Sequence, residues 1–145
     1  MFRALFVGIV MAVVGGRMAA PVILAAATSA LGGSWFGRWL TASALPAILV
    51  AGVALLAGAA VARVSGVRAR LGVAAYAALA GASGVPQLLM QFQNAAGDSR
   101  YAGAAWGALG NVALAVGCVV LGGWLGSGKN WTAAEPAGGQ PPIRS

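Results

Sequence analysis

The chain has 145 residues, of which 60% are hydrophobic and only 8% are charged. Soluble domains carry about 25% charged residues, so this composition excludes an ordinary soluble protein and indicates an integral membrane protein. The sequence has no histidine, one cysteine and two acidic residues. We therefore expect no metal site, no cofactor and no acid–base catalysis, and we interpret the chain as a non-enzyme. The nine basic residues are spread along the chain and match no nucleic-acid motif, so we expect no nucleic-acid partner.

The first predicted element is an apolar run over residues 4–27, about the length that crosses a bilayer. The run begins like a signal peptide, but we interpret it as the first membrane span. Arg17 lies near its midpoint, after Gly15 and Gly16 and before Pro21. An arginine at mid-membrane costs at least about 2.5 kcal/mol. Paired glycines and a proline loosen a helix and free carbonyl groups that can face the guanidinium.

Two interpretations of Arg17 stay open. The residue either marks the end of a short helix and snorkels to a lipid headgroup, or it is a buried cation that binds an anion, a cofactor carboxylate or a partner's acidic group. The two acidic residues, Asp98 and Glu135, lie outside the apolar segments, so neither is placed to neutralise Arg17 within the chain.

Small residues recur at every fourth position of this first run. They are Ala4, Gly8, Ala12, Gly16 and Ala20. Such a stripe lets another helix approach closely in lipid, so we expect it to be the main packing face. Stripes of this kind also arise by chance in a chain rich in glycine and alanine.

The remaining elements follow in chain order. A glycine-rich loop with aromatic residues is predicted at residues 32–39, a second span at 40–62, a short basic loop, a third span at 71–91, a polar turn at 94–100 and a fourth span at 102–125. The sequence therefore predicts an all-α polytopic membrane protein, with about four transmembrane helices in residues 1–126 and an extended Gly/Pro-rich tail over residues 127–145.

The basic residues predict the orientation of these spans. With both termini in the cytoplasm, six basic residues fall on the cytoplasmic side: Arg3, Arg63, Arg68, Arg70, Lys129 and Arg144. Only Arg38 and Arg100 fall on the other side, as the positive-inside rule requires. Trp and Tyr residues near the span ends are typical of interfacial aromatic belts. We expect a multi-pass protein of the bacterial inner membrane.

Polar side chains inside the later spans are the other candidate binding residues. Gln87, Gln91 and Asn94 share one helix face after Pro86, either as a helix end wetted at the interface or as a polar lining that faces Arg17 or a partner. Asn111 is a lone amide in the fourth span, more typical of helix–helix contacts than of a ligand. In the same span, the GxxxG spacing of Gly103 and Gly107 predicts a further packing face.

One local stretch resembles a known family. Residues 10–23, VMAVVGGRMAAPVI, within the span 4–27, resemble the helix-end motif of the NnrS-type polytopic membrane proteins, in which a Gly-Arg pair closes a span and a proline follows. The resemblance implies a haem- or copper-associated protein linked to nitric oxide. That family has far more spans, and the histidines it would need are absent here, so we carry over no metal site.

Two functions are consistent with these observations. The first is a non-catalytic accessory or structural subunit of a larger membrane complex of the respiratory or photosynthetic type, which packs against other subunits through small-residue helix faces. The alternative is a small homo-oligomeric channel or transporter, in which Arg17 interacts with an anion and Gln87 or Asn111 lines the path. The expected partners are the lipid bilayer and either other membrane subunits or further copies of this chain.

Overall fold

The computed structural model describes residues 2–131, and these residues are helical almost throughout. The main helices are α1 (Phe2–Val13), α2 (Ala20–Leu31), α3 (Trp35–Trp39), α4 (Leu45–Ser65), α5 (Ala69–Gly97) and α6 (Ala102–Ser127). Short π-helical turns, η1 (Val14–Ala19) and η2 (Leu40–Ala44), join α1 to α2 and α3 to α4. The 3-10 turns η3 (Gly66–Arg68), η4 (Ser99–Tyr101) and η5 (Gly128–Trp131) lie at the ends of α4, α5 and α6. The all-α prediction is confirmed, and most of the expected tail, from residue 132 onward, lies outside the described residues.

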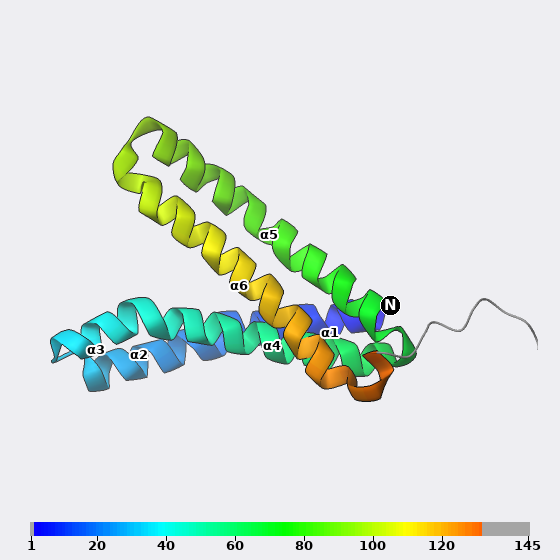
Figure 1. The fold of residues 1–145 in the computed structure, drawn as a ribbon. Coiled ribbons are helices and arrows are strands. Elements are labelled where there is room, and N and C mark those ends of the chain that lie inside the picture. Colours follow the sequence, from blue (N-terminus) through cyan, green and yellow to red (C-terminus); the bar gives the residue numbers. More distant parts are fainter. Residues whose placement is uncertain (1, 132–145) are drawn as a thin grey trace, which may run out of the picture.

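Three helical stretches of the described chain are long and apolar enough to cross a membrane. They cover Phe2–Leu31, Trp35–Gly97 and Ser99–Ser127. The second stretch has 63 residues, far more than the roughly 20 that one crossing needs, and it turns back on itself at Gly66 (Figure 1). Gly66 has φ +57°, a backbone conformation that glycine adopts without the steric cost other residues meet.

The helices form two hairpins that diverge from one shared end (Figure 1). The first hairpin pairs α1 and α2 with α3 and α4, and the second pairs α5 with α6. The start of α1, the turn between α4 and α5, and the end of α6 lie together at the shared end. The α2–α3 turn and the α5–α6 turn form two separate tips.

Glycines set the close approach of helices where the hairpins meet. A Cβ atom at Gly58 of α4 would overlap the carbonyl of Val119 in α6, and one at Gly122 of α6 would overlap the carbonyl of Leu55 in α4. Removing side chains lets the two backbones touch, which is the main source of helix association in lipid. Val119 belongs to the buried core, which also includes Val61 and Val73.

Both π-turns have the same cause. Each is followed by a proline, Pro21 at the start of α2 and Pro46 at the start of α4. A proline has no N–H and its ring clashes with the carbonyl four residues earlier, so the hydrogen-bond ladder widens. In η1 the Ala20 N–H donates to the Gly15 carbonyl, five residues back. The predicted loosening of the first span near its glycines and proline is thus confirmed.

Two predicted loops are shorter in the structure than the sequence indicated. The glycine-rich loop expected at 32–39 is already helical from Trp35, because the Ser34 side chain accepts a hydrogen bond from Gly37 N–H at 2.9 Å and caps the new helix. The polar turn expected at 94–100 begins only after Gly97, since α5 continues through Pro86 and the polar residues beyond it. Asp98 then caps the turn, and its carboxylate forms an ion pair with Arg100 at 3.1 Å.

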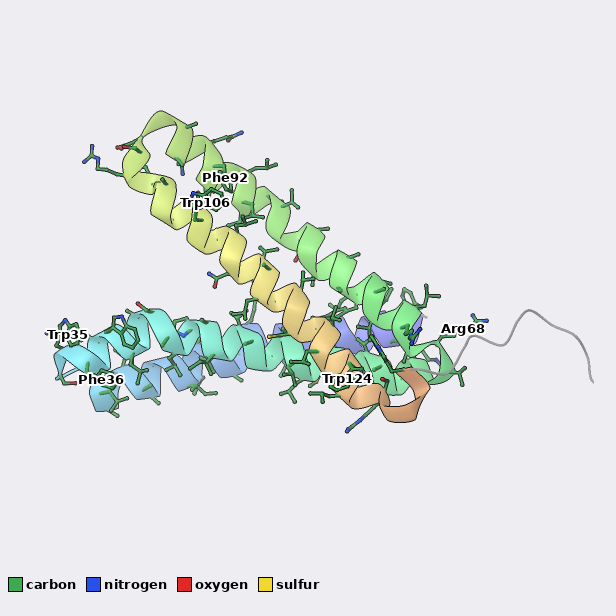
Figure 2. All side chains as sticks on the ribbon, in the orientation of Figure 1. Trp35, Phe36, Arg68, Phe92, Trp106 and Trp124 are labelled. Carbon is green, nitrogen blue, oxygen red and sulfur yellow. The ribbon has the colours of Figure 1, made fainter. Side chains whose placement is uncertain are left out.

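Aromatic residues gather near the ends of the hairpins. Trp35 and Phe36 lie at the tip of the first hairpin, and Phe92 and Trp106 lie near the tip of the second (Figure 2). The Phe92 and Trp106 rings make an edge-to-face contact, with their centroids 5.8 Å apart. At the shared end, the Arg70 guanidinium lies 5.9 Å from the Trp131 ring centroid. Rings at both ends of the helices match the aromatic belts of membrane spans.

Candidate binding cleft

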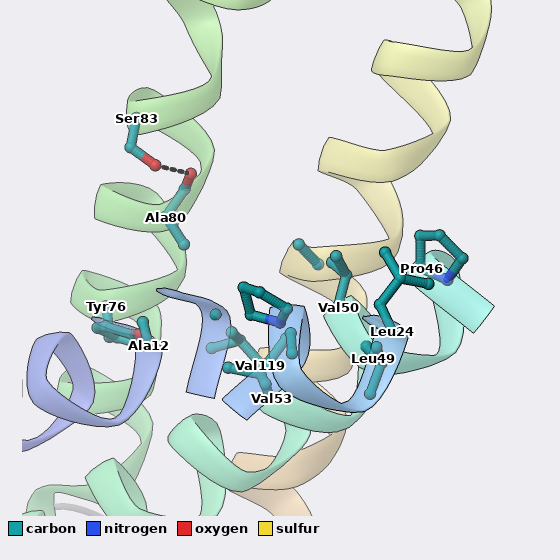
Figure 3. A pocket seen from close by; sticks show the side chains of 15 residues that line it. Ala12, Leu24, Pro46, Leu49, Val50, Val53, Tyr76, Ala80, Ser83 and Val119 are labelled. Carbon is teal, nitrogen blue, oxygen red and sulfur yellow. Dashed lines mark hydrogen bonds between the residues drawn. The ribbon is translucent and has the colours of Figure 1, made fainter. Parts of the chain in front are cut away.

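Two adjoining cavities lie between the diverging hairpins. The first has a volume of about 470 Å³ and is lined by η1, α2, α4, α5 and α6, with Ala12 of α1 at its edge (Figure 3). The second has a volume of about 370 Å³ and is lined by Val50 of α4 with residues 80–88 of α5 and 108–115 of α6. Four residues line both cavities: Val50, Ala80, Ser83 and Ala115. The two cavities therefore form one continuous cleft.

The first cavity is almost entirely hydrocarbon. Pro21, Leu24, Pro46 and Leu49 line it from the first hairpin (Figure 3). Both prolines follow π-turns, and Gly16 of η1 also lines the cavity, so the irregular part of the first span borders the cleft. Non-α backbone at membrane depth is tolerated where it is buried in protein or lines a cavity. We refer to this space as the apolar cavity.

The two polar side chains of the apolar cavity already have hydrogen-bond partners. Tyr76 is 5% exposed, and its hydroxyl donates to the Gly8 carbonyl of α1 at 2.9 Å. The Ser83 hydroxyl donates to the Ala80 carbonyl at 2.7 Å, as Figure 3 shows. Each hydroxyl proton is thus used within the protein, and the cavity offers a ligand little beyond apolar contact.

The second cavity carries two predicted binding residues. Gln87 of α5 and Asn111 of α6 both line it, although they are 24 positions apart in the sequence. Within residues 2–131 the structure shows no hydrogen bond from either amide side chain, and both residues are exposed to the cleft. Each amide can donate two hydrogen bonds and accept two. We refer to this space as the amide cavity.

Arg17 and Gln91 lie outside both cavities. Arg17 is in η1, directly after the cavity residue Gly16, and its side chain is exposed. Gln91 is half-buried in α5, one turn beyond Gln87 and nearer the hairpin tip. The structure thus brings Gln87 and Asn111 to one cavity, whereas Arg17 and Gln91 line neither cavity.

The small-residue stripe of the first span is used in two ways. Ala4 and Gly8 are buried, and a Cβ atom at Gly8 would lie 2.6 Å from the Tyr76 ring. Ala12, Gly16 and Ala20 line the apolar cavity instead. At the other expected packing residues, Gly103 and Gly107, a built Cβ would meet nothing within 4 Å beyond the adjoining backbone of its own helix, within the described chain.

Sequence reasoning did not identify Tyr76, Ser83 or the apolar wall as parts of a site. A signal for Tyr76 was present, because a tyrosine in an apolar span needs a hydrogen-bond partner. No such signal marks the wall, whose residues resemble any others of a membrane helix. Among residues 2–131, no group of three His, Cys, Asp or Glu residues is arranged to hold a metal ion.

Comparisons of the chain with protein-family models, curated proteins and solved structures found no match. The cleft is therefore interpreted from its own geometry.

Proposed function

We propose that this chain is a small membrane channel or carrier, and that its route is the cleft between the two hairpins. The observation that carries the proposal is the pairing of Gln87 and Asn111 across the amide cavity. Polar groups in a membrane segment are costly and commonly mark the path of a substrate. Two amides that line a shared cavity, with no hydrogen bond from either within the described residues, are available to a solute.

The proposed topology has four spans, with both termini in the cytoplasm and the protein in the inner membrane. The reversal at Gly66 supports it, because it divides the 63-residue stretch into α3–α4 and α5. The positive-inside rule supports the orientation: Arg3, Arg63, Arg68 and Arg70 belong to the segments at the shared end, whereas Arg38 and Arg100 belong to the tips.

Arg17 has a separate role in this proposal. It is exposed in the π-turn of the first span, and mid-membrane exposure of a charge to hydrocarbon is unfavourable. We propose that an anion or a second copy of the chain meets Arg17 in a homo-oligomer. A guanidinium that binds in this way uses its planar fork of donors, so Arg17→Lys impairs the oligomer even though it keeps the charge.

Reconstitution into lipid vesicles tests the proposed transport. Release of three probes is followed: chloride, glycerol and a fluorescent monoacylglycerol. We expect at least one probe to cross faster than in protein-free vesicles, and we expect Gln87→Leu and Asn111→Leu to slow it severalfold. Gln93→Leu is the matched control, because Gln93 is an exposed amide of α5 that lines neither cavity. Equal rates with and without protein for all three probes would refute the proposal.

The second candidate is a non-catalytic accessory subunit of a membrane complex. The open glycine face of α6 favours it, since a Cβ built at Gly103, Gly107 or Gly110 would meet nothing within 4 Å beyond the adjoining backbone of α6, within the described chain. A foreign helix could approach that face closely. Purification in mild detergent separates the candidates: unrelated subunits co-purify with an accessory subunit, whereas a channel or carrier purifies as copies of itself.

A further inference from the structure

We propose that the cleft binds a neutral amphiphile, with its hydrocarbon tail in the apolar cavity and an uncharged, hydrogen-bonding headgroup beside Gln87 and Asn111. This ligand class rests on the proposed function only in using the cleft as the binding route. Binding and transport are measured separately below, so one can fail without the other.

The tail position follows from the lining of the apolar cavity. Tyr76 and Ser83 are its polar side chains within the described residues, and both hydroxyls donate to backbone carbonyls. A small ion or sugar placed there would lose its water without gaining donors, which is unfavourable. A hydrocarbon chain has no hydrogen bonds to water that it would lose on entering the cavity.

The headgroup position follows from the amide cavity. Gln87 and Asn111 supply donors and acceptors together, so they suit hydroxyl, ester or amide groups. Among residues 2–131, no charged side chain lines either cavity. A phosphate or carboxylate headgroup would therefore have no opposite charge to pair with.

The two positions are joined by residues that belong to both. Val50, Ala80, Ser83 and Ala115 lie where the apolar cavity meets the amide cavity, so one molecule can reach from one to the other. The volumes of about 470 Å³ and 370 Å³ are within the range of small-molecule sites. An apolar space that continues into a neutral polar space is complementary to an amphiphile and to neither a purely polar nor a purely apolar ligand.

Photo-crosslinking of the full chain in detergent micelles tests the proposal. The probe is a monoacylglycerol with a diazirine in its acyl chain, and the labelled residues are mapped by mass spectrometry. We expect labelling on the α4, α5 and α6 residues that line the apolar cavity. Unlabelled monooleoylglycerol should suppress it at a concentration at least tenfold lower than lysophosphatidylglycerol, whose headgroup is anionic.

Matched variants separate the tail site from the headgroup site. Ala80→Phe fills the shared wall and should abolish labelling, whereas Ala82→Phe, on an exposed part of α5 outside both cavities, should not. Gln87→Leu and Asn111→Leu should each weaken monooleoylglycerol competition about three- to tenfold, the range for one lost hydrogen bond. Gln93→Leu should leave it unchanged. Thermal unfolding of each variant checks that it is folded.

Several results would overturn the inference. Equal competition by the neutral and the anionic lipid would mean that the cleft holds only bulk lipid chains. A disulfide between two copies of an Ala80→Cys variant would mean that a second copy covers the cleft. Labelling without flux would support the proposed ligand class and refute the proposed transport. Flux without labelling would refute the ligand class.

Discussion

At the scale of single residues, neighbours rather than residue type decide what a glycine does in this chain. Gly8 and Gly16 belong to one stripe of small residues with a spacing of four. Gly8 lies against Tyr76 and Val61, whereas Gly16 lines the apolar cavity with nothing within 4 Å of a built Cβ. The stripe was expected to be a single packing face, but one half of it packs against other helices and the other half borders the apolar cavity.

This division predicts different outcomes for two identical substitutions. Gly8→Leu should lower thermal stability in detergent by the equivalent of about 1–3 kcal/mol or more, because the new side chain has no space. Gly16→Leu should be tolerated in folding and should instead reduce monoacylglycerol labelling in the cleft. Val7→Leu, at a half-buried neighbouring position, and Val14→Leu, at an exposed one, are the controls for added volume. Equal stability of all four variants would show that the contacts at Gly8 do not contribute to the stability of the protein.

At the scale of elements, prolines and glycines determine where the helices change course. Pro21 and Pro46 widen the preceding turn into a π-helix, and Gly66 reverses the chain between α4 and α5. Pro86 has a different outcome: α5 stays α-helical through it. Proline alone therefore does not specify a π-turn.

The reversal at Gly66 makes a topological prediction. Single cysteines at Val67 and Ser99 should react with a membrane-impermeant maleimide from opposite sides of the membrane, with position 67 on the cytoplasmic side. Val67 is a better probe than neighbouring Ser65, whose hydroxyl oxygen is buried. A cysteine-free background, Cys118→Ala, provides the control. Reaction of both positions from the same side would exclude the four-span topology.

At the scale of the whole molecule, the diverging shape follows from where the small residues lie. Gly58 on α4 and Gly122 on α6 let the hairpins touch near the shared end, and nothing equivalent joins the tips. The cleft exists because this contact is local. Its integrity should therefore depend on a few backbone contacts rather than on a large core.

Two glycines of α6 test this dependence. Gly122→Leu should destabilise the protein strongly, because even a Cβ atom there would overlap the Leu55 carbonyl, and backbone cannot move aside as a side chain can. Gly117→Leu, in the same helix but with nothing within 4 Å, should change thermal stability by less than about 1 kcal/mol. Similar stabilities of the two variants would contradict the proposed contact.

Composition and hydropathy by themselves determined that the protein is all-α and that it has helices able to cross a membrane. Every backbone polar group in lipid must be satisfied within a helix or a closed barrel, and apolar runs of about 20 residues fit helices, since barrel strands are about half that length. The loosened first span was also predictable, since Gly15, Gly16 and Pro21 act locally.

Only the tertiary structure decided the rest. The pairing of Gln87 with Asn111, the hydrogen-bond partner of Tyr76, and the different surroundings of Gly8 and Gly16 depend on contacts between different helices. Residues of membrane helices are apolar whether they face lipid, a neighbour or a cavity, so hydrophobic periodicity does not separate these environments. The cleft therefore follows from how the two hairpins cross, which no local pattern specifies.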